Sequence, residues 1–126
     1  MSSPGPHPEI LTMADRQIPV HLRPATSMDS TFMFQLFRDV RAPDFQDLPL
    51  AMAALLLEMQ FRAQASAYQE RFPDCENHII ITDQGQAIGR LLLDGSPPCV
   101  RIIDIALRGE FRSRGIGTSL IRDLQS

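Results

Sequence analysis

The sequence contains no lysine, and all twelve of its basic residues are arginine. This absence excludes three kinds of chemistry, because a P-loop lysine, a Schiff-base lysine and a lysine general base each need the missing residue. Acidic residues outnumber the arginines. The formal net charge of −3 therefore argues against a dedicated nucleic-acid-binding domain, which is normally basic.

Cysteines and long apolar runs are also scarce. Cys75 and Cys99 form neither a metal-spaced pair nor a disulfide framework, so we interpret each as a small buried hydrophobic residue. His7, His21 and His78 are scattered and predict no metal site. No run of about eighteen apolar residues occurs, so no membrane span is expected. The N-terminus lacks the layout of a signal peptide, which favours a cytoplasmic protein.

The chain of 126 residues, 44% apolar and 21% charged, has the size and composition of one globular domain. Residues 1–18 are rich in proline and glycine and show no apolar periodicity, so they predict a flexible tail. The sequence is compatible with a translation start at Met1 or at Met13. Residues 19–126 form the predicted domain.

The first half of this domain predicts a strand and two helices. Residues 19–24 alternate apolar and polar side chains and form a short strand. A helix follows, with Asp29 or Ser30 as its N-cap. Its apolar stripe is expected to consist of Phe32, Met33, Leu36, Phe37 and Val40. Residues 48–72 predict the longest helix, whose apolar face is expected to consist of Met52, Leu55, Leu56, Met59, Ala63 and Ala67. Glu58, Arg62 and Glu70 are expected on its solvent face.

The second half predicts strands over residues 77–83, 86–95 and 99–108, joined by short turns at 84–85 and 96–98 into an antiparallel meander. A last helix begins near residue 116, and its stripe is Ile116, Leu120, Ile121 and Leu124. The chain is therefore expected to be an α/β (α+β) layered domain with a mostly antiparallel sheet.

The turn between the last strand and the last helix reads FRSRGIGT (residues 111–118). Gly115 and Gly117 let the backbone approach an anion without a Cβ clash. A helix N-terminus offers unpaired N–H groups and a favourable dipole, while Arg112 and Arg114 can neutralise charge and Thr118 can donate a hydroxyl. This arrangement suits a pyrophosphate. The dinucleotide fingerprint fails, because it needs a third glycine three residues after Gly117.

The segment VRIIDIALRGEFRSRGIGTSLIRDLQ (residues 100–125) resembles the core motif of the GNAT superfamily of acyl-CoA-dependent N-acyltransferases. The family pattern is Arg or Gln, two residues, Gly, one residue, then Gly or Ala, and here Arg112, Gly115 and Gly117 fill it. The upstream order, with HLRPAT at residues 21–26, is also similar, so the resemblance covers about residues 19–125. It implies a partial GNAT-like fold of order β-α-α-β-β-β-α.

The resemblance implies an N-acetyltransferase that uses acetyl-CoA and no metal. The pyrophosphate would be bound by the loop residues Arg112, Ser113, Arg114, Gly115, Ile116, Gly117 and Thr118. The pantetheine arm would hydrogen-bond the strand end Ile105, Ala106 and Leu107, beside a bulge where the strand splays from its neighbour. An amine acceptor would then attack the thioester directly in a ternary complex, without a covalent enzyme intermediate.

Asp104 is the candidate catalytic residue, because the amine needs to be neutral to attack and a carboxylate can help to deprotonate it. It interrupts the apolar stretch RIIDIAL and is expected to share a strand face with Val100, Ile102 and Ala106. An unpaired carboxylate there would be costly. A salt bridge to Arg90 on the neighbouring strand is therefore the alternative interpretation.

Four other residues have expected places outside this motif. Tyr68 is expected in the core or at a rim. Phe61 and Phe72 are expected to pack in the core, with an acceptor pocket as the alternative. Glu110 is expected to be an exposed loop acid.

Complete members of the family continue past the motif helix with a strand, a helix and further strands, whereas this sequence ends at Ser126. Three hypotheses follow: a truncated form of an acetyltransferase; a non-catalytic module that binds CoA weakly or mediates an interaction; or half of an assembly that a second chain completes. A homodimer through the edge of strand 99–108 is one form of the third, because that edge would be exposed and apolar. The sequence does not specify the acceptor, the general acid or the oligomeric state.

Overall fold

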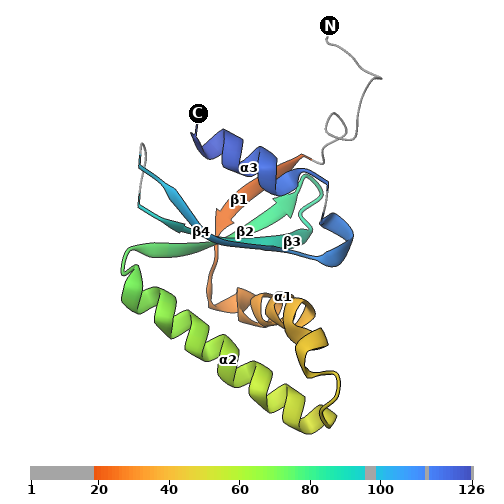
Figure 1. Ribbon diagram of the computed structural model, residues 1–126. Coiled ribbons are helices and arrows are strands. Elements are labelled where there is room, and N and C mark those ends of the chain that lie inside the picture. Colours follow the sequence, from red (N-terminus) through yellow and green to blue (C-terminus); the bar gives the residue numbers. More distant parts are fainter. Residues whose placement is uncertain (1–18, 96–98, 113, 126) are drawn as a thin grey trace, which may run out of the picture.

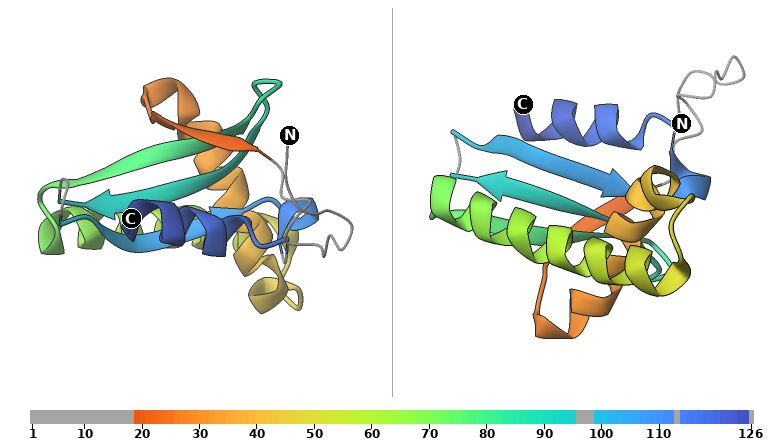
Figure 2. Two further views of the ribbon diagram at one scale, coloured as in Figure 1. Left: turned by 90° about the horizontal axis from the view of Figure 1, so that it is seen from above. Right: turned by 60° about the horizontal axis from the view of Figure 1, so that its bottom comes forward.

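The computed structural model describes residues 19–95, 99–112 and 114–125, which form three layers (Figure 1). Helices α1 (Ser30–Arg41) and α2 (Leu50–Arg71) lie on one face of a sheet, and α3 (Ile116–Gln125) lies on the other (Figure 2). Short 3-10 turns occupy Ser27–Asp29, Ala42–Phe45 and Gly109–Phe111. The expected α+β class is confirmed.

The sheet within the described residues has four strands, each antiparallel to its neighbour. In spatial order these are β1 (Val20–Pro24), β2 (Cys75–Thr82), β3 (Ala87–Asp94) and β4 (Arg101–Leu107). The meander predicted over residues 77–108 is therefore confirmed. Ile79 and Ile80 are both 0% exposed, although they are consecutive, because helices cover both faces of β2.

The core beneath α3 joins that helix to the middle of the sheet. Ile116 and Leu120 of α3 pack in one buried cluster with Ile80, Ile88 and Leu91, which confirms the first half of the predicted stripe. The side chains of residues 121 and 124, the tail 1–18 and the turn 96–98 lie outside the described part of the chain.

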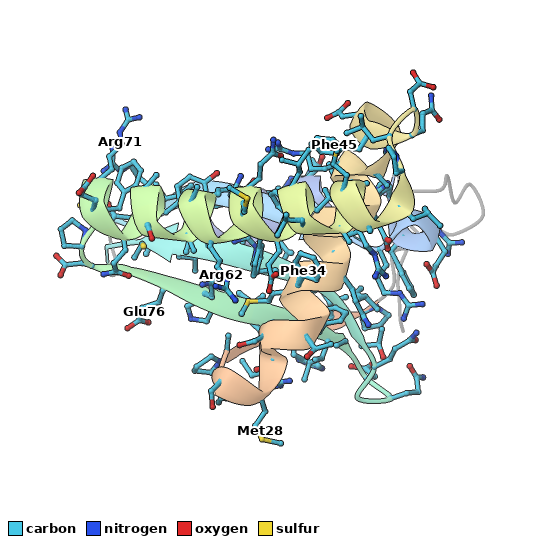
Figure 3. All side chains as sticks on the ribbon, turned by 90° about the horizontal axis from the view of Figure 1, so that it is seen from below. Met28, Phe34, Phe45, Arg62, Arg71 and Glu76 are labelled. Atoms are coloured by element: carbon cyan, nitrogen blue, oxygen red, sulfur yellow. The ribbon has the colours of Figure 1, made fainter. Side chains whose placement is uncertain are left out.

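The core on the other face joins α1 to α2. Leu36 and Phe37 are buried, as predicted, whereas Val40 is 48% exposed. Phe34 points from α1 toward α2 (Figure 3), and its ring meets that of Phe61 with centroids 5.3 Å apart. The Phe37 and Phe61 centroids are 5.4 Å apart, so three aromatic rings tie the two helices together.

The predicted apolar face of α2 is wrong except at Leu56, which is half-buried. Met52, Leu55 and Met59 are at least half exposed, and Ala63 and Ala67 are exposed as well. The side that faces the protein instead carries Ala53, Leu57, Phe61, Gln64 and Tyr68, which are buried or half-buried. The predicted solvent positions at Glu58, Arg62 and Glu70 are confirmed. No helix in the described residues combines the length and apolarity that crossing a bilayer requires.

A β-bulge in β4 overturns one expectation about Asp104. Leu92 of β3 pairs with Asp104, but Leu93 pairs with Ile102, so Ile103 is an extra residue on the β4 side. Val100 and Ile102 pack toward α3 together with Ile105 and Leu107. The alternation had predicted that Asp104 shares the face of Val100 and Ile102, and this prediction is wrong. Asp104 lies with Ala106 on the side of α1 and α2.

Glycine at position 89 lets β3 and β4 approach closely at the end of the sheet. A Cβ placed on Gly89 would lie 2.6 Å from the Ala106 carbonyl oxygen and 2.7 Å from Leu107 Cδ2. Neither distance is compatible with a real Cβ, so any other residue would push the strands apart. The position of the last residues of β4 therefore depends on this glycine.

The entry to α1 is fixed by an ion pair. Asp29 precedes the helix as predicted, but its carboxylate does not cap α1. It accepts two hydrogen bonds from Arg23 of β1, at 2.8 and 2.9 Å, and one from the Thr26 N–H at 2.8 Å. Thr26 in turn caps the 3-10 turn, so the two residues form a capping box. These bonds lower the pKa of Asp29 to about 2, with those from Arg23 contributing most.

Candidate functional site

A cavity of about 340 Å³ lies where the end of β4 meets the start of α3. It is lined by Val40, Ile105, Ala106, Leu107, Arg112, Gly115, Ile116, Gly117 and Thr118. Of the predicted cofactor-binding residues, only Arg114 and Ser113 are missing from this wall, and Ser113 lies outside the described residues. The strand end and the glycine turn, which the sequence predicts to bind two parts of one ligand, thus line one cavity.

The turn into α3 depends on Gly115. Its φ of 76° lies in the left-handed region, which side chains other than glycine rarely adopt. The first helical bond runs from the Ser119 N–H to the Gly115 carbonyl, at 2.9 Å. The N–H groups of Ile116, Gly117 and Thr118 therefore precede the helical ladder. Because these residues line the cavity, the positive end of the helix dipole faces it.

The two arginines of the turn differ in position. Arg112 lines the cavity, and its Nε donates to the Leu107 carbonyl at 2.9 Å, which ties the turn to the end of β4. Arg114 is exposed, and its guanidinium lies 5.8 Å from the centre of the Phe111 ring. Arg112 is thus the better placed of the two to neutralise an anion in the cavity.

The outer edge of β4 has no partner strand within the described residues. Side chains satisfy two of its backbone groups instead. The Ile105 N–H donates to Asp104 Oδ1 at 2.9 Å, and the Leu107 carbonyl accepts the bond from Arg112. Both groups lie on the cavity wall, so an extended ligand arm could exchange with these side chains.

A second cavity, of about 160 Å³, adjoins the first, and the two share Val40, Ile105 and Ala106 in their walls. It lies between α1, α2 and β4. Its polar lining consists of Arg41, Gln64, Tyr68, Arg90 and Asp104. Its apolar lining consists of Met33, Leu36, Phe37, Val40, Phe61, Ile105 and Ala106.

Asp104 is paired with Arg90, as the alternative interpretation proposed. Arg90 Nη2 donates to Asp104 Oδ2, while the second oxygen of Asp104 accepts the Ile105 N–H. Arg90 also donates to Asn77 Oδ1 at 3.3 Å. The Asp104 side chain nevertheless keeps 32% of its surface exposed and lines the second cavity. The ion pair therefore orients the carboxylate without removing it from the cavity.

Tyr68 lines the second cavity and is half-buried, which agrees with the expected place at a rim. The pKa of its hydroxyl is raised, first by burial and then by the negative charge of Asp104. The positive charges of Arg90 and Arg41 act in the opposite direction. The Tyr68 hydroxyl, Asp104 and both arginines therefore share one electrostatic environment.

Phe61 and Phe72, for which an acceptor pocket was the alternative to core packing, differ in position. Phe61 lines the second cavity while also packing on α1. Phe72 is absent from that wall, and the guanidinium groups of Arg71 and Arg101 lie over its ring. Arg41 and Gln64 were not predicted as site residues, because an arginine in the last turn of a helix and a glutamine on a long helix are both ordinary surface patterns.

Glu110, His21 and the two cysteines line neither cavity. Cys75 is half-buried and Cys99 is exposed, so the prediction that both are buried is wrong for Cys99. Glu110 pairs with Arg108 at 3.0 Å and is exposed, as predicted. His21 contacts Asp83 at 2.6 Å, on exposed side chains. Among the described residues, no group of three or more His, Cys, Asp or Glu side chains is placed to hold a metal ion.

Comparison with protein families finds a match over most of the chain. Residues 34–126 match the Acetyltransferase (GNAT) family, which is about three quarters of the chain. The chain therefore belongs to the GNAT acetyltransferase family, and the resemblance seen in the sequence is confirmed. A comparison with curated proteins found no match.

Proposed function

We propose that the protein transfers an acetyl group from acetyl-CoA to an amine acceptor by direct attack in a ternary complex. The observation that carries this proposal is the pair of adjoining cavities, one lined by a helix N-terminus and a strand end, the other by an oriented carboxylate. Their shared wall at Ile105 and Ala106 is where two substrates would meet.

The first cavity fits the chemistry of CoA. The N–H groups at the start of α3 and the guanidinium of Arg112 suit the two negative charges of a pyrophosphate. The strand end at Ile105, Ala106 and Leu107 offers backbone donors and acceptors to an amide-containing arm such as pantetheine. In this proposal the backbone amides of Ser113 and Arg114, in the same loop, also bind the pyrophosphate.

In the second cavity Asp104 accepts a proton from the acceptor amine, directly or through water, so that the nitrogen attacks as a neutral amine. The new N–C bond forms as the C–S bond of the thioester breaks. The departing thiolate takes up one proton, and the products are an N-acetylated amine and free CoA. Arg90 holds the Asp104 carboxylate in place throughout.

The unpaired outer edge of β4 favours a second candidate, in which another chain adds a strand there. A homodimer through this edge would complete the wall of the pantetheine site, and a chain without such a partner would be a weak CoA-binding or interaction module. Light scattering separates these possibilities, because a folded protein that stays monomeric with and without acetyl-CoA excludes the dimer. We also propose the cytoplasm as its compartment, since both cysteines are free.

Thermal shift with acetyl-CoA tests the proposed cofactor. At about 100 times its dissociation constant a ligand adds about 2.7 kcal/mol to the free energy of unfolding, or about 10 °C in Tm for a domain of this size. Gly117→Asp and Gly117→Asn add side chains of equal size, and a Cβ there has room, 3.6 Å from Ile105 Cδ1. Because only Asp brings a negative charge to the pyrophosphate, Gly117→Asp should lose more of the shift. No shift with the wild type, or equal shifts for both variants, would refute the proposed site.

A further inference from the structure

The second cavity carries an uncompensated positive charge. One carboxylate, Asp104, and two guanidinium groups, Arg90 and Arg41, line it. Arg90 pairs with Asp104, whereas Arg41 forms no ion pair with any carboxylate in the described residues. The wall therefore has a net charge of +1 while Tyr68 is neutral.

Arg41 is held at this wall by packing. It is the last residue of α1, is half-buried, and its guanidinium lies 5.0 Å from the centre of the Phe37 ring. Its charge is felt across the cavity, since it lowers the pKa of Tyr68 against the larger opposite effect of burial. A planar guanidinium fixed in this way presents paired donors that match a carboxylate.

The size of the cavity limits what can enter it. Its volume is about 160 Å³. A cavity of about 150 Å³ lined by apolar side chains holds a molecule the size of benzene. Met33, Leu36 and Phe61 supply such a lining here. The apolar part of the space therefore suits a group of about four to seven carbon atoms.

We infer that the acceptor is an amino acid with an apolar side chain, whose carboxylate pairs with Arg41 and whose amine lies near Asp104. This inference rests on the proposed acetyltransferase function and specifies its substrate class. A simple alkylammonium ion would enter a wall that is already positive, and the two like charges would repel each other. An amino acid brings its own negative charge, and its apolar side chain fills the remaining space.

The test compares two acceptors that differ only in the carboxylate, L-phenylalanine and 2-phenylethylamine, by release of free CoA thiol. Wild-type kcat/KM is expected to be about 10- to 100-fold higher for phenylalanine, the range that a charge-assisted hydrogen bond supplies. Arg41→Gln should remove this preference. Arg38→Gln on the same helix, whose side chain is 50% exposed, should keep it. Equal kcat/KM for the two amines in the wild type, or a preference that persists in Arg41→Gln, would overturn the inference.

A binding measurement covers the case in which turnover is too slow to measure. In the presence of CoA, calorimetry with N-acetyl-L-phenylalanine and N-acetyl-2-phenylethylamine should show tighter binding of the first, and Arg41→Gln should abolish the difference. Equal affinity, or no binding of either compound, would reject the amino-acid acceptor. Failure of acetyl-CoA itself to bind would instead reject the proposed function, so the two failures are distinguishable.

Discussion

Replacing Gly89 by alanine should loosen the sheet at the wall of the larger cavity. The added Cβ would lie 2.6 Å from the Ala106 carbonyl oxygen, 2.7 Å from Leu107 Cδ2 and 3.2 Å from Ile80 Cδ1. The leucine side chain can rotate away, but the carbonyl belongs to the β3–β4 ladder. Relief of that contact therefore requires the two strands to separate by several tenths of an ångström.

Forced overpacking of this kind costs about 1–3 kcal/mol, and replacing a strand glycine returns about 0.5–1 kcal/mol of conformational entropy. We therefore expect Gly89→Ala to lower the free energy of unfolding by about 1–2 kcal/mol, or Tm by about 4–8 °C. Because Ala106 and Leu107 also line the cavity, the Kd of acetyl-CoA should rise.

Urea denaturation and thermal melts measure the stability, and calorimetry measures the Kd. Gly109→Ala is the matched control, since a Cβ at Gly109 meets nothing closer than Arg112 Nη1 at 4.0 Å. This control should change stability by no more than about 0.5 kcal/mol. If Gly89→Ala unfolds at the wild-type urea concentration and binds acetyl-CoA as well as the wild type does, the close approach of β3 and β4 is not structurally important.

Two further predictions concern carboxylates. Asp29→Ala should lower the free energy of unfolding by about 1–2 kcal/mol at pH 7 through loss of the capping box. Because the pKa of Asp29 is lowered from 3.8 to about 2, its contribution is complete above pH about 4 and is lost as the pH falls toward 2. Urea melts at pH 7, 4 and 3 check this, and a wild-type-to-variant difference that stays constant would contradict it. Asp104→Asn should lower kcat about 100-fold, whereas Arg90→Met, which breaks the ion pair but keeps the carboxylate, should lower it less. A kcat in Asp104→Asn equal to that of Arg90→Met would leave Asp104 with a structural role alone.

The sequence predicted the elements best where their signals were local. The meander of β2, β3 and β4 followed from short β-branched runs separated by turn residues and joined by short connections. The place of β1 beside β2 was not predicted, because about fifty residues separate the two strands. The binding turn was visible because a strand, two glycines and an amphipathic helix are consecutive in the chain. The turn and the end of β4 line the same cavity because β4 directly precedes the turn in the chain.

The failures arose where a uniform apolar pattern left several choices open. Helix α2 contains Leu55, Leu56 and Leu57 in succession, so apolar side chains point in several directions and periodicity could not select the face that the sheet would bury. In β4 the run of isoleucines around Ile103 carries no mark of the extra residue, and the alternation was continued through it. Arg41 could not be assigned to a site, because its neighbours in the cavity come from α2, β3 and β4.

The bulge at Ile103 divides β4 into two segments whose inward positions are out of phase. Upstream of it the even-numbered residues 100 and 102 face α3, and downstream the odd-numbered residues 105 and 107 do so. The strand can therefore keep apolar side chains against α3 along its whole length and still present an acid, Asp104, to the opposite face. One inserted residue thus lets the two faces of the strand carry different side chains, an apolar row against α3 and an acid in the wall of the smaller cavity.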